Sequence, residues 1–247
     1  MCTLIVAWRV FEDTPVCVAA NRDEATDRPS IPPHVRDEDG KPTVLAPRDD
    51  RAGGTWLGYN DAGVLVAVTN RWVSGEGERS RGLLVDDCLS ERSVSAAIGA
   101  LETELRTRSY APFHLLAADG NACLLVVHDG DGTCIRHRLS PGVHIVVNVG
   151  FDGEWFVPKQ RPEAGRRQGR NADRIRSELQ PKAGERAAEW TDRAGSILGD
   201  HDYGVCLHGE GFGTRSSSLV RLGADRVFEY ADGPPCESPF ERIGERV

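Results

Sequence analysis

The sequence has no hydrophobic run long enough to cross a membrane, since none of its apolar stretches reaches the roughly 18 residues that a transmembrane helix requires. It also lacks the basic leader of a signal peptide, because no basic residue precedes the short apolar run at the N-terminus. With 247 residues, of which 39% are hydrophobic and 28% charged, the chain has the composition of a globular protein. We therefore expect one domain, residues 1–247, located in the cytoplasm.

Lysine is scarce, and the sequence has no long basic block. The chain carries 30 basic residues against 38 acidic ones, which gives a formal net charge of −8. Its densest basic stretch, residues 161–174, is interrupted by Glu163 and Asp173. Since a protein that binds nucleic acid non-specifically needs a basic face, we expect no nucleic-acid partner.

No two cysteines have the Cys-x-x-Cys spacing, which disfavours redox and zinc-ribbon sites. The chain has seven cysteines, an odd number that favours free thiols in a reducing compartment. The pairs Cys206-x-His208 and Cys134-x-x-His137 together offer four nitrogen and sulfur ligands, but they lie far apart in the sequence. Because cysteines in strands usually pack as small core residues, we expect no metal and no cofactor.

Short apolar runs separated by turn residues predict strands at residues 4–7, 16–20, 64–69, 113–118, 122–127, 134–138, 143–147, 205–207, 217–222 and 227–230. Helical spacing of apolar residues predicts helices at residues 83–89, 94–105, 166–179 and 190–198, with Ser93 as an N-cap. The prolines of residues 25–50 predict an irregular loop. Strands and helices in groups indicate an α+β fold with antiparallel sheets.

Cys2 is the first candidate for chemistry because of its position. Removal of the initiator Met before a small residue would leave a thiol and an α-amine on the same residue. An α-amine has a pKa of about 7.7–8.0, so part of it is the free base at neutral pH and can accept the thiol proton. The alternative is that Cys2 is simply a small second residue.

Polar residues at strand ends supply the other candidates. Asn21-Arg22-Asp23-Glu24 follows an apolar strand, and the predicted hairpin brings it near Cys2, where Asp23 would orient the amine and Arg22 would stabilise an anion. Asn70 and Asn148 end two other strands and offer amide donors to an oxyanion. Each of these residues also fits an ordinary solvated turn.

Several motifs, in this order along the chain, resemble those of the NRDE family, also called the transport and Golgi organisation protein 2 family. They are Met1-Cys2-Thr3, Asn21-Arg22-Asp23-Glu24, Arg28-Pro29, Gly53-Gly54-Thr55-Trp56-Leu57-Gly58, Thr69-Asn70, Arg81-Gly82 and Gly213-Thr214-Arg215-Ser216-Ser217.

The resemblance implies an N-terminal nucleophile hydrolase fold, a four-layer αββα sandwich of two antiparallel sheets. In the cysteine branch of those hydrolases, which cleaves non-peptide amide bonds, the matching residues imply a site in which Cys2 is the nucleophile and Asp23 orients its amine. Asn70, Asn148 and Arg215 then complete the catalytic set, and Asn21, Arg22 and Trp56 contact substrate. In that branch an Arg lies three residues before the Asp; here that position is Ala20, and the nearest Arg is Arg22. Neighbours on a regular strand point to opposite faces, so a regular strand would not aim both Arg22 and Asp23 at Cys2.

The sequence supports two functions. The first is a cysteine hydrolase that cleaves an amide or related acyl bond of a small substrate. The second is a non-catalytic carrier of a hydrophobic anionic ligand, either haem or an acyl-CoA or other lipid, which Arg22 or Arg215 would pair with. A scaffold role is disfavoured by the absence of repeats.

Overall fold

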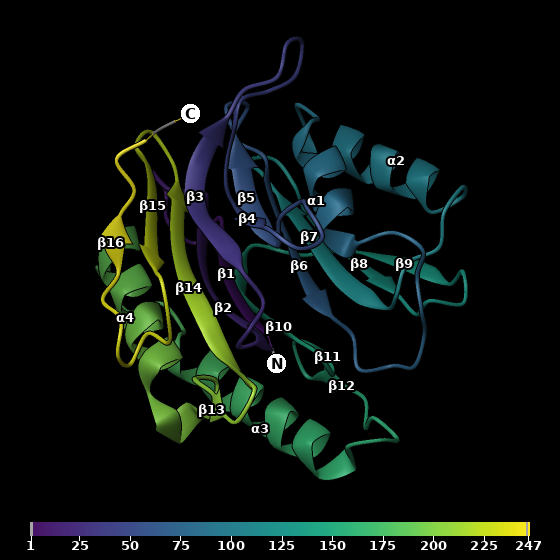
Figure 1. Cartoon of the computed structure of the whole chain (residues 1–247). Helices are drawn as coiled ribbons and strands as arrows, with labels where there is room; N and C mark the ends of the chain where they lie inside the picture. The colour runs from purple at the N-terminus through teal and green to yellow at the C-terminus, as the bar shows by residue number, and fades with distance from the viewer. Residues whose placement is uncertain (1, 246) are drawn as a thin grey trace. The chain divides into compact units, whose positions relative to one another are not determined.

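The computed structural model describes residues 2–245 and 247, and its elements are labelled in Figure 1. The chain divides into two compact units. The first consists of Met1–Asp27 with Pro141–Ile243, and the second of Arg28–Ser140 with Gly244–Val247. The prediction of a single domain stays a prediction.

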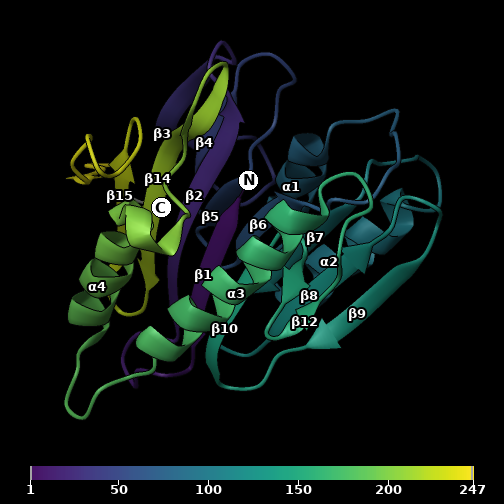
Figure 2. The ribbon, with the colours of Figure 1, turned by 90° about the horizontal axis from the view of Figure 1, so that it is seen from below.

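The first unit is built on a nine-stranded antiparallel sheet with the order β12-β11-β10-β1-β2-β14-β15-β16, in which β13 also pairs with β14. Its strands are β1 (Thr3–Trp8), β2 (Val16–Ala25), β10 (Gly142–Val147), β11 (Gly150–Phe151), β12 (Glu154–Trp155), β13 (His208–Gly209), β14 (Phe212–Leu222), β15 (Arg226–Ala231) and β16 (Glu241–Arg242). Helix α3 (Pro162–Glu178) packs against β10, and α4 (Ala187–Gly199) packs against β2 and β14 (Figure 2). Every residue of β1 is buried, as expected of a continuous apolar run in a central strand.

The second unit is built on a seven-stranded antiparallel sheet with the order β3-β4-β5-β6-β7-β8-β9. Its strands are β3 (Ser30–Arg36), β4 (Val44–Asp49), β5 (Leu57–Asn60), β6 (Leu65–Asn70), β7 (Phe113–Ala118), β8 (Cys123–His128) and β9 (Cys134–Arg138). Helices α1 (Arg81–Leu89) and α2 (Val94–Glu104) share an apolar core with the sheet. The predicted N-cap is confirmed, since the backbone N–H of Ala96 donates to Oγ of Ser93 over 3.2 Å.

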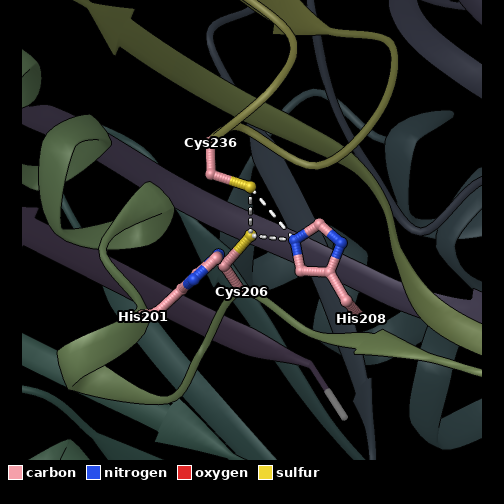
Figure 3. A group of neighbouring side chains, drawn as sticks. All are labelled: His201, Cys206, His208 and Cys236. Atoms are coloured by element: carbon pink, nitrogen blue, oxygen red, sulfur yellow. Dashed lines mark hydrogen bonds between the residues drawn. The ribbon is translucent and has the colours of Figure 1, made fainter.

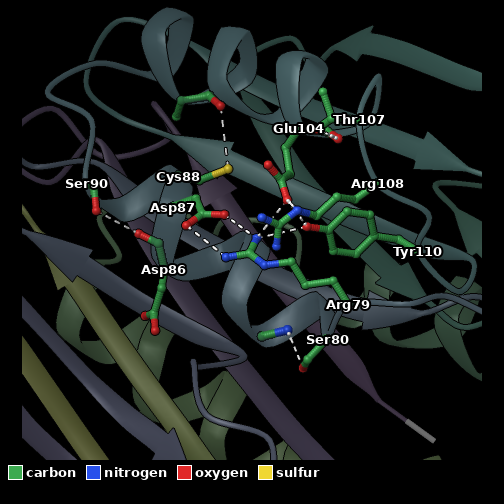
Figure 4. Close-up of polar contacts among 12 residues, drawn as sticks. Arg79, Ser80, Asp86, Asp87, Cys88, Ser90, Glu104, Thr107, Arg108 and Tyr110 are labelled. Atoms are coloured by element: carbon green, nitrogen blue, oxygen red, sulfur yellow. Dashed lines mark hydrogen bonds and ion pairs between the residues drawn. The ribbon is translucent and has the colours of Figure 1, made fainter.

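The half-buried guanidinium of Arg79 joins the two helices of this unit to the loop that precedes β7 (Figure 4). Arg79 forms an ion pair with Asp87 of α1 and lies 3.2 Å from a carboxylate oxygen of Glu104 at the end of α2. It also donates to the Tyr110 hydroxyl over 2.8 Å. These contacts fix the angle between α1 and α2 by directional bonds in addition to apolar packing.

Two predicted segments differ from the structure. Residues 25–50 contain β3 and β4 as well as loop, and Pro32 and Pro33 lie within β3. A strand tolerates them because β3 is an edge of its sheet and its pairing with β4 is irregular between Ile31 and His34. Residues 205–207 form no strand: the Val205 oxygen accepts from the Asn21 side chain, and Leu207 bonds to both the hydroxyl and the main chain of Thr214.

The predicted class is confirmed: the fold is α+β, with two antiparallel sheets and four α-helices among the described residues. No helix within residues 2–245 combines the length and the apolar character that crossing a bilayer requires.

Candidate functional site

Cys2 lies directly before the first residue of β1. β1 lies in the sheet between β2 and β10 (Figure 1). Thr3 pairs with Asn21 on one side and with Val147 on the other. The Cys2 thiol lies 3.9 Å from the main-chain oxygen of Asp23. The predicted proximity of Cys2 to the Asn21–Glu24 segment is therefore confirmed.

Asn148 holds the backbone nitrogen of Cys2. That nitrogen donates to Oδ1 of Asn148 over 3.0 Å, and the same oxygen accepts a 3.0 Å bond from Nε2 of Gln168. Since a backbone N–H is only a donor, the atom facing it must be the amide oxygen, which fixes the orientation of the Asn148 side chain. Nδ2 is then the donor that Asn148 can offer to a developing oxyanion.

Asp23 is buried and accepts a 2.6 Å hydrogen bond from the Thr214 hydroxyl. Burial raises the pKa of Asp23 to about 7, against the opposing effect of the Thr214 bond. Near neutral pH this carboxyl group therefore exchanges between its neutral and ionised forms, and its charge next to Cys2 depends on pH.

The Cys2 thiol titrates above its ordinary range. Burial is the largest cause of the raised pKa, and the Asp23 charge adds to it, whereas the Arg22 charge lowers the pKa of the thiol. A thiol of this kind stays protonated at neutral pH until a base adjacent to it takes the proton.

Arg22 and Asp23 are both buried although they are neighbours on β2. The pairing of β2 with β14 is irregular here, since Asp23 pairs with Thr214 and Arg22 with Ser216, so Arg215 is an extra residue on β14. Arg215 is half-buried, and its Nε has no hydrogen-bond partner among the described residues. The bulge thus adds an arginine to β14, in the same unit as Cys2 and directly after Thr214, whose hydroxyl bonds to Asp23.

Asn21 ties β2 to the segment that follows α4. Its Nδ2 donates to the main-chain oxygens of Leu198 and Val205 over 3.0 and 2.8 Å, and its Oδ1 accepts from Ser217. Both amide hydrogens are thereby committed to main-chain acceptors, which gives Asn21 a structural task beside its predicted contact with substrate.

Two predicted site residues belong to the second unit. Asn70 is the exposed last residue of β6, and Trp56 is half-buried directly before β5. Their roles stay predictions. Gln168 and Thr214 were not predicted as site residues. Thr214 lies within the Gly-Thr-Arg-Ser-Ser motif, which could have indicated it, whereas the sequence around Gln168 predicts only a helix.

The model of the Transport and Golgi organisation 2 family matches residues 1–168. The chain belongs to this family. A human relative, the Transport and Golgi organization protein 2 homolog, is 27% identical over 236 residues, which cover 84% of this chain and 82% of the relative.

Solved structures similar to this chain include an acylase, an amidase ortholog and a bile acid hydrolase. Penicillin V acylase from Agrobacterium tumefaciens has a TM-score of 0.59 at 15% identity, with 94% of this chain and 83% of the acylase covered. The N-acylethanolamine-hydrolyzing acid amidase ortholog of Caenorhabditis elegans has the same score and identity, with 88% and 92% covered. A conjugated bile acid hydrolase mutant from Clostridium perfringens has a TM-score of 0.55 at 13% identity, with 100% and 97% covered. These likenesses show that the fold is that of the N-terminal nucleophile hydrolases.

Proposed function

We propose that the protein is an N-terminal-cysteine hydrolase that cleaves the amide or a related acyl bond of a small molecule. The observation that supports this most directly is the 3.0 Å bond between the Cys2 nitrogen and Asn148. Met1 lies outside the described residues. After its removal this nitrogen is the α-amine of Cys2, the residue that also carries the thiol. The buried side chain of Asn148 then holds the amine in place.

The reaction would proceed in two halves. The α-amine takes the thiol proton while the sulfur attacks the substrate carbonyl carbon, and Nδ2 of Asn148 donates to the resulting oxyanion. The protonated amine then gives its proton to the leaving nitrogen as the carbon–nitrogen bond breaks, which leaves a thioester on Cys2. Water, deprotonated by the same amine, hydrolyses the thioester and releases the acid.

Charge in the site favours an acyl substrate with an anionic or strongly polar part. Arg22 is buried and its charge acts on the Cys2 thiol, Arg215 is half-buried on the neighbouring strand β14, and guanidinium groups bind carboxylates with paired hydrogen bonds. Asn70 and Trp56 belong to the second unit, and the roles that the resemblance implies for them stay predictions.

The first test is the intact mass of the protein purified from its native host, before and after brief treatment with iodoacetamide. We expect Met1 to be absent and a single rapid modification at Cys2, faster than at the exposed Cys134, which has no adjacent amine. Cys2→Ala should abolish turnover of penicillin V, an N-acylethanolamine and a conjugated bile acid, the substrate types named for proteins of similar fold. Cys134→Ala is the matched control and should retain it.

Retained Met1, or turnover that persists in Cys2→Ala, would contradict the hydrolase proposal. The carrier function then becomes the better hypothesis. Its own test is a haem Soret shift, or acyl-CoA binding, that survives Cys2→Ala.

A further inference from the structure

Four side chains with metal-binding atoms converge in the first unit, outside the residues assigned to catalysis (Figure 3). They are His201, Cys206, His208 and Cys236, and their ligand atoms all lie within 4.8 Å of one another. They come from the 3₁₀ turn at His201–Tyr203, the loop after it, β13 and the turn that follows β15. Cys134 and His137, which the sequence offered as partners of Cys206 and His208, lie in the second unit.

The distances among Cys206, His208 and Cys236 are close to those of a tetrahedral metal site. The two sulfur atoms lie 3.4 Å apart, and Nε2 of His208 lies 3.7 Å from the Cys206 sulfur and 3.1 Å from the Cys236 sulfur. Bonds of about 2.3 Å to sulfur and about 2.0 Å to nitrogen at tetrahedral angles place sulfurs about 3.8 Å apart and sulfur about 3.5 Å from nitrogen. The observed separations lie within about half an ångström of these values.

We propose that His201, Cys206, His208 and Cys236 form a structural Zn²⁺ site. Two thiolates and two imidazoles are a donor set typical of structural zinc, and a site with four protein ligands leaves no position for substrate. Binding replaces the two thiol protons, which leave to solvent, and the two histidines bind as neutral rings. The bound site is then electrically neutral.

A carboxylate next to the group supports this assignment. Nε2 of His208 faces the two sulfurs, while Nδ1 of the same ring lies 3.8 Å from a carboxylate oxygen of Glu237. Histidines that bind metals commonly direct their second nitrogen to a carboxylate, which sets the tautomer of the ring. The His201 and His208 rings are 5.2 Å apart in an edge-to-face arrangement, so two rings approach the sulfurs from separate segments.

The site would join segments that have little regular structure of their own. Between α4 and β14 the described chain forms only the 3₁₀ turn and the two-residue β13, and Cys236 lies in a turn where Glu237 N–H donates to the Pro234 oxygen. His201, His208 and Cys236 are exposed, so an ion can reach them from solvent. A metal ion is one means of stabilising such a region without a large apolar core.

The loop with these ligands also contacts Asp23. Leu207, between Cys206 and His208, donates its N–H to the Thr214 hydroxyl over 2.9 Å, and that hydroxyl donates to Asp23 over 2.6 Å. The Thr214 N–H bonds back to the Leu207 oxygen over 2.9 Å. An ion bound by the neighbouring residues would therefore fix the position of the group that hydrogen-bonds Asp23.

The test uses the full chain with Zn²⁺ and Co²⁺ as probes. After removal of metal with a chelator and reduction of the thiols, we expect saturable binding of one ion per chain and a visible cobalt spectrum of tetrahedral thiolate type. Cys236→Ser and His208→Gln should lose stoichiometric binding and the rise in unfolding temperature on adding zinc. Cys134→Ser removes an exposed cysteine outside the group and should change neither.

Three results would overturn the proposal. The first is a wild-type titration without saturation or with only an octahedral cobalt spectrum, and the second is full stoichiometric binding by both ligand variants. The third is a purified protein whose mass lacks the two thiol hydrogens and whose digest contains a linked Cys206–Cys236 peptide, which would assign the pair to a disulfide. Because His208→Gln keeps both cysteines, it tests the proposal even if Cys236→Ser fails to fold. None of these measurements depends on Cys2 labelling or on turnover, so they are independent of the hydrolase proposal.

Discussion

At the scale of single residues, the buried carboxyl group of Asp23 sets the pH response of the candidate site. Its pKa of about 7 exceeds the ordinary value because burial disfavours the ionised form. At a pH between about 4, the ordinary pKa of an aspartate, and about 7, Asp23 is protonated in the folded protein but ionised in the unfolded chain. The contribution of Asp23 to the free energy of unfolding therefore falls as pH rises from about 4 to about 7 and is constant outside this range.

Asp23→Asn should remove this dependence. The amide keeps an oxygen to accept the Thr214 bond and has no charge to desolvate. We expect the stability of the variant relative to the wild type to increase between pH 5 and pH 8, measured by urea unfolding at both values. A difference that does not change with pH would show that Asp23 is not held neutral by burial.

The same residue gives a kinetic signature. If Asp23 orients the Cys2 amine, the iodoacetamide labelling rate of Cys2 should have an inflection near pH 7 that is missing in Asp23→Asn. Labelling of the exposed Cys134 serves as the internal control in both proteins.

At the scale of elements, the Gly-Gly-Thr-Trp motif fixes the start of α1. Gly54 has φ +73°, and a Cβ added there would lie 2.2 Å from the carbonyl carbon of Gly82. The Thr55 N–H donates to the Gly82 oxygen over 3.0 Å. The motif that carried much of the family resemblance therefore joins the loop before β5 to the first turn of a helix.

Gly54→Ala should destabilise the protein severely, because it adds a clash with backbone to a left-handed conformation. Gly53 is a matched control: its φ of +69° is similar, but a Cβ there would meet only Leu83 Cδ2 at 3.5 Å. Gly53→Ala should cost about 1–2 kcal/mol, the usual penalty of the left-handed conformation alone. Thermal unfolding of both variants checks this. An equal decrease of the unfolding temperature in the two variants would mean that the contact of residue 54 with Gly82 is not tight.

Sequence patterns predicted the elements whose signal is local. The β1–β2 hairpin, both helix pairs and the Ser93 cap follow from apolar spacing and capping chemistry. The strand β3 was missed because its prolines oppose a strand everywhere except at an edge, and edge position depends on the whole sheet. The Cys206–Cys236 contact was missed for the same kind of reason, since turns far apart in the chain bring the two sulfurs together.

In the candidate site, Cys2, Asp23 and Asn148 were predicted from their positions in the sequence and from the resemblance to the family. The pairing of the strands brings these three residues together. The bulge at Arg215 was not predicted, although it accompanies the burial of both Arg22 and Asp23. A bulge arises from the pairing of two strands, and no pattern within either strand encodes it.

At the scale of the whole molecule, the order of strands makes the first unit discontinuous in sequence. β1 and β2 lie between β10 and β14, so the N-terminal hairpin occupies the middle of a sheet whose other strands follow residue 141. A fragment of residues 141–247 would lack two central strands and expose the edges of β10 and β14.

We expect that fragment to be unfolded by circular dichroism and by amide dispersion in NMR spectra. Adding a separate peptide of residues 1–27 should restore ordered spectra, because it supplies both missing strands. Ordered spectra from the fragment alone would mean that β10 and β14 can pair without the hairpin.

The central place of the hairpin also bears on how the chain is made. The ribosome makes β1 and β2 before residues 28–140 of the second unit, and it makes β10 and β14 only after them. Throughout that interval the hairpin has two unpaired edges and an apolar strand, which is the kind of surface that aggregates or recruits chaperones. Pairing over so long a separation is slow, so the hairpin is made well before β10 and β14 and reaches its final surroundings only after they have been made.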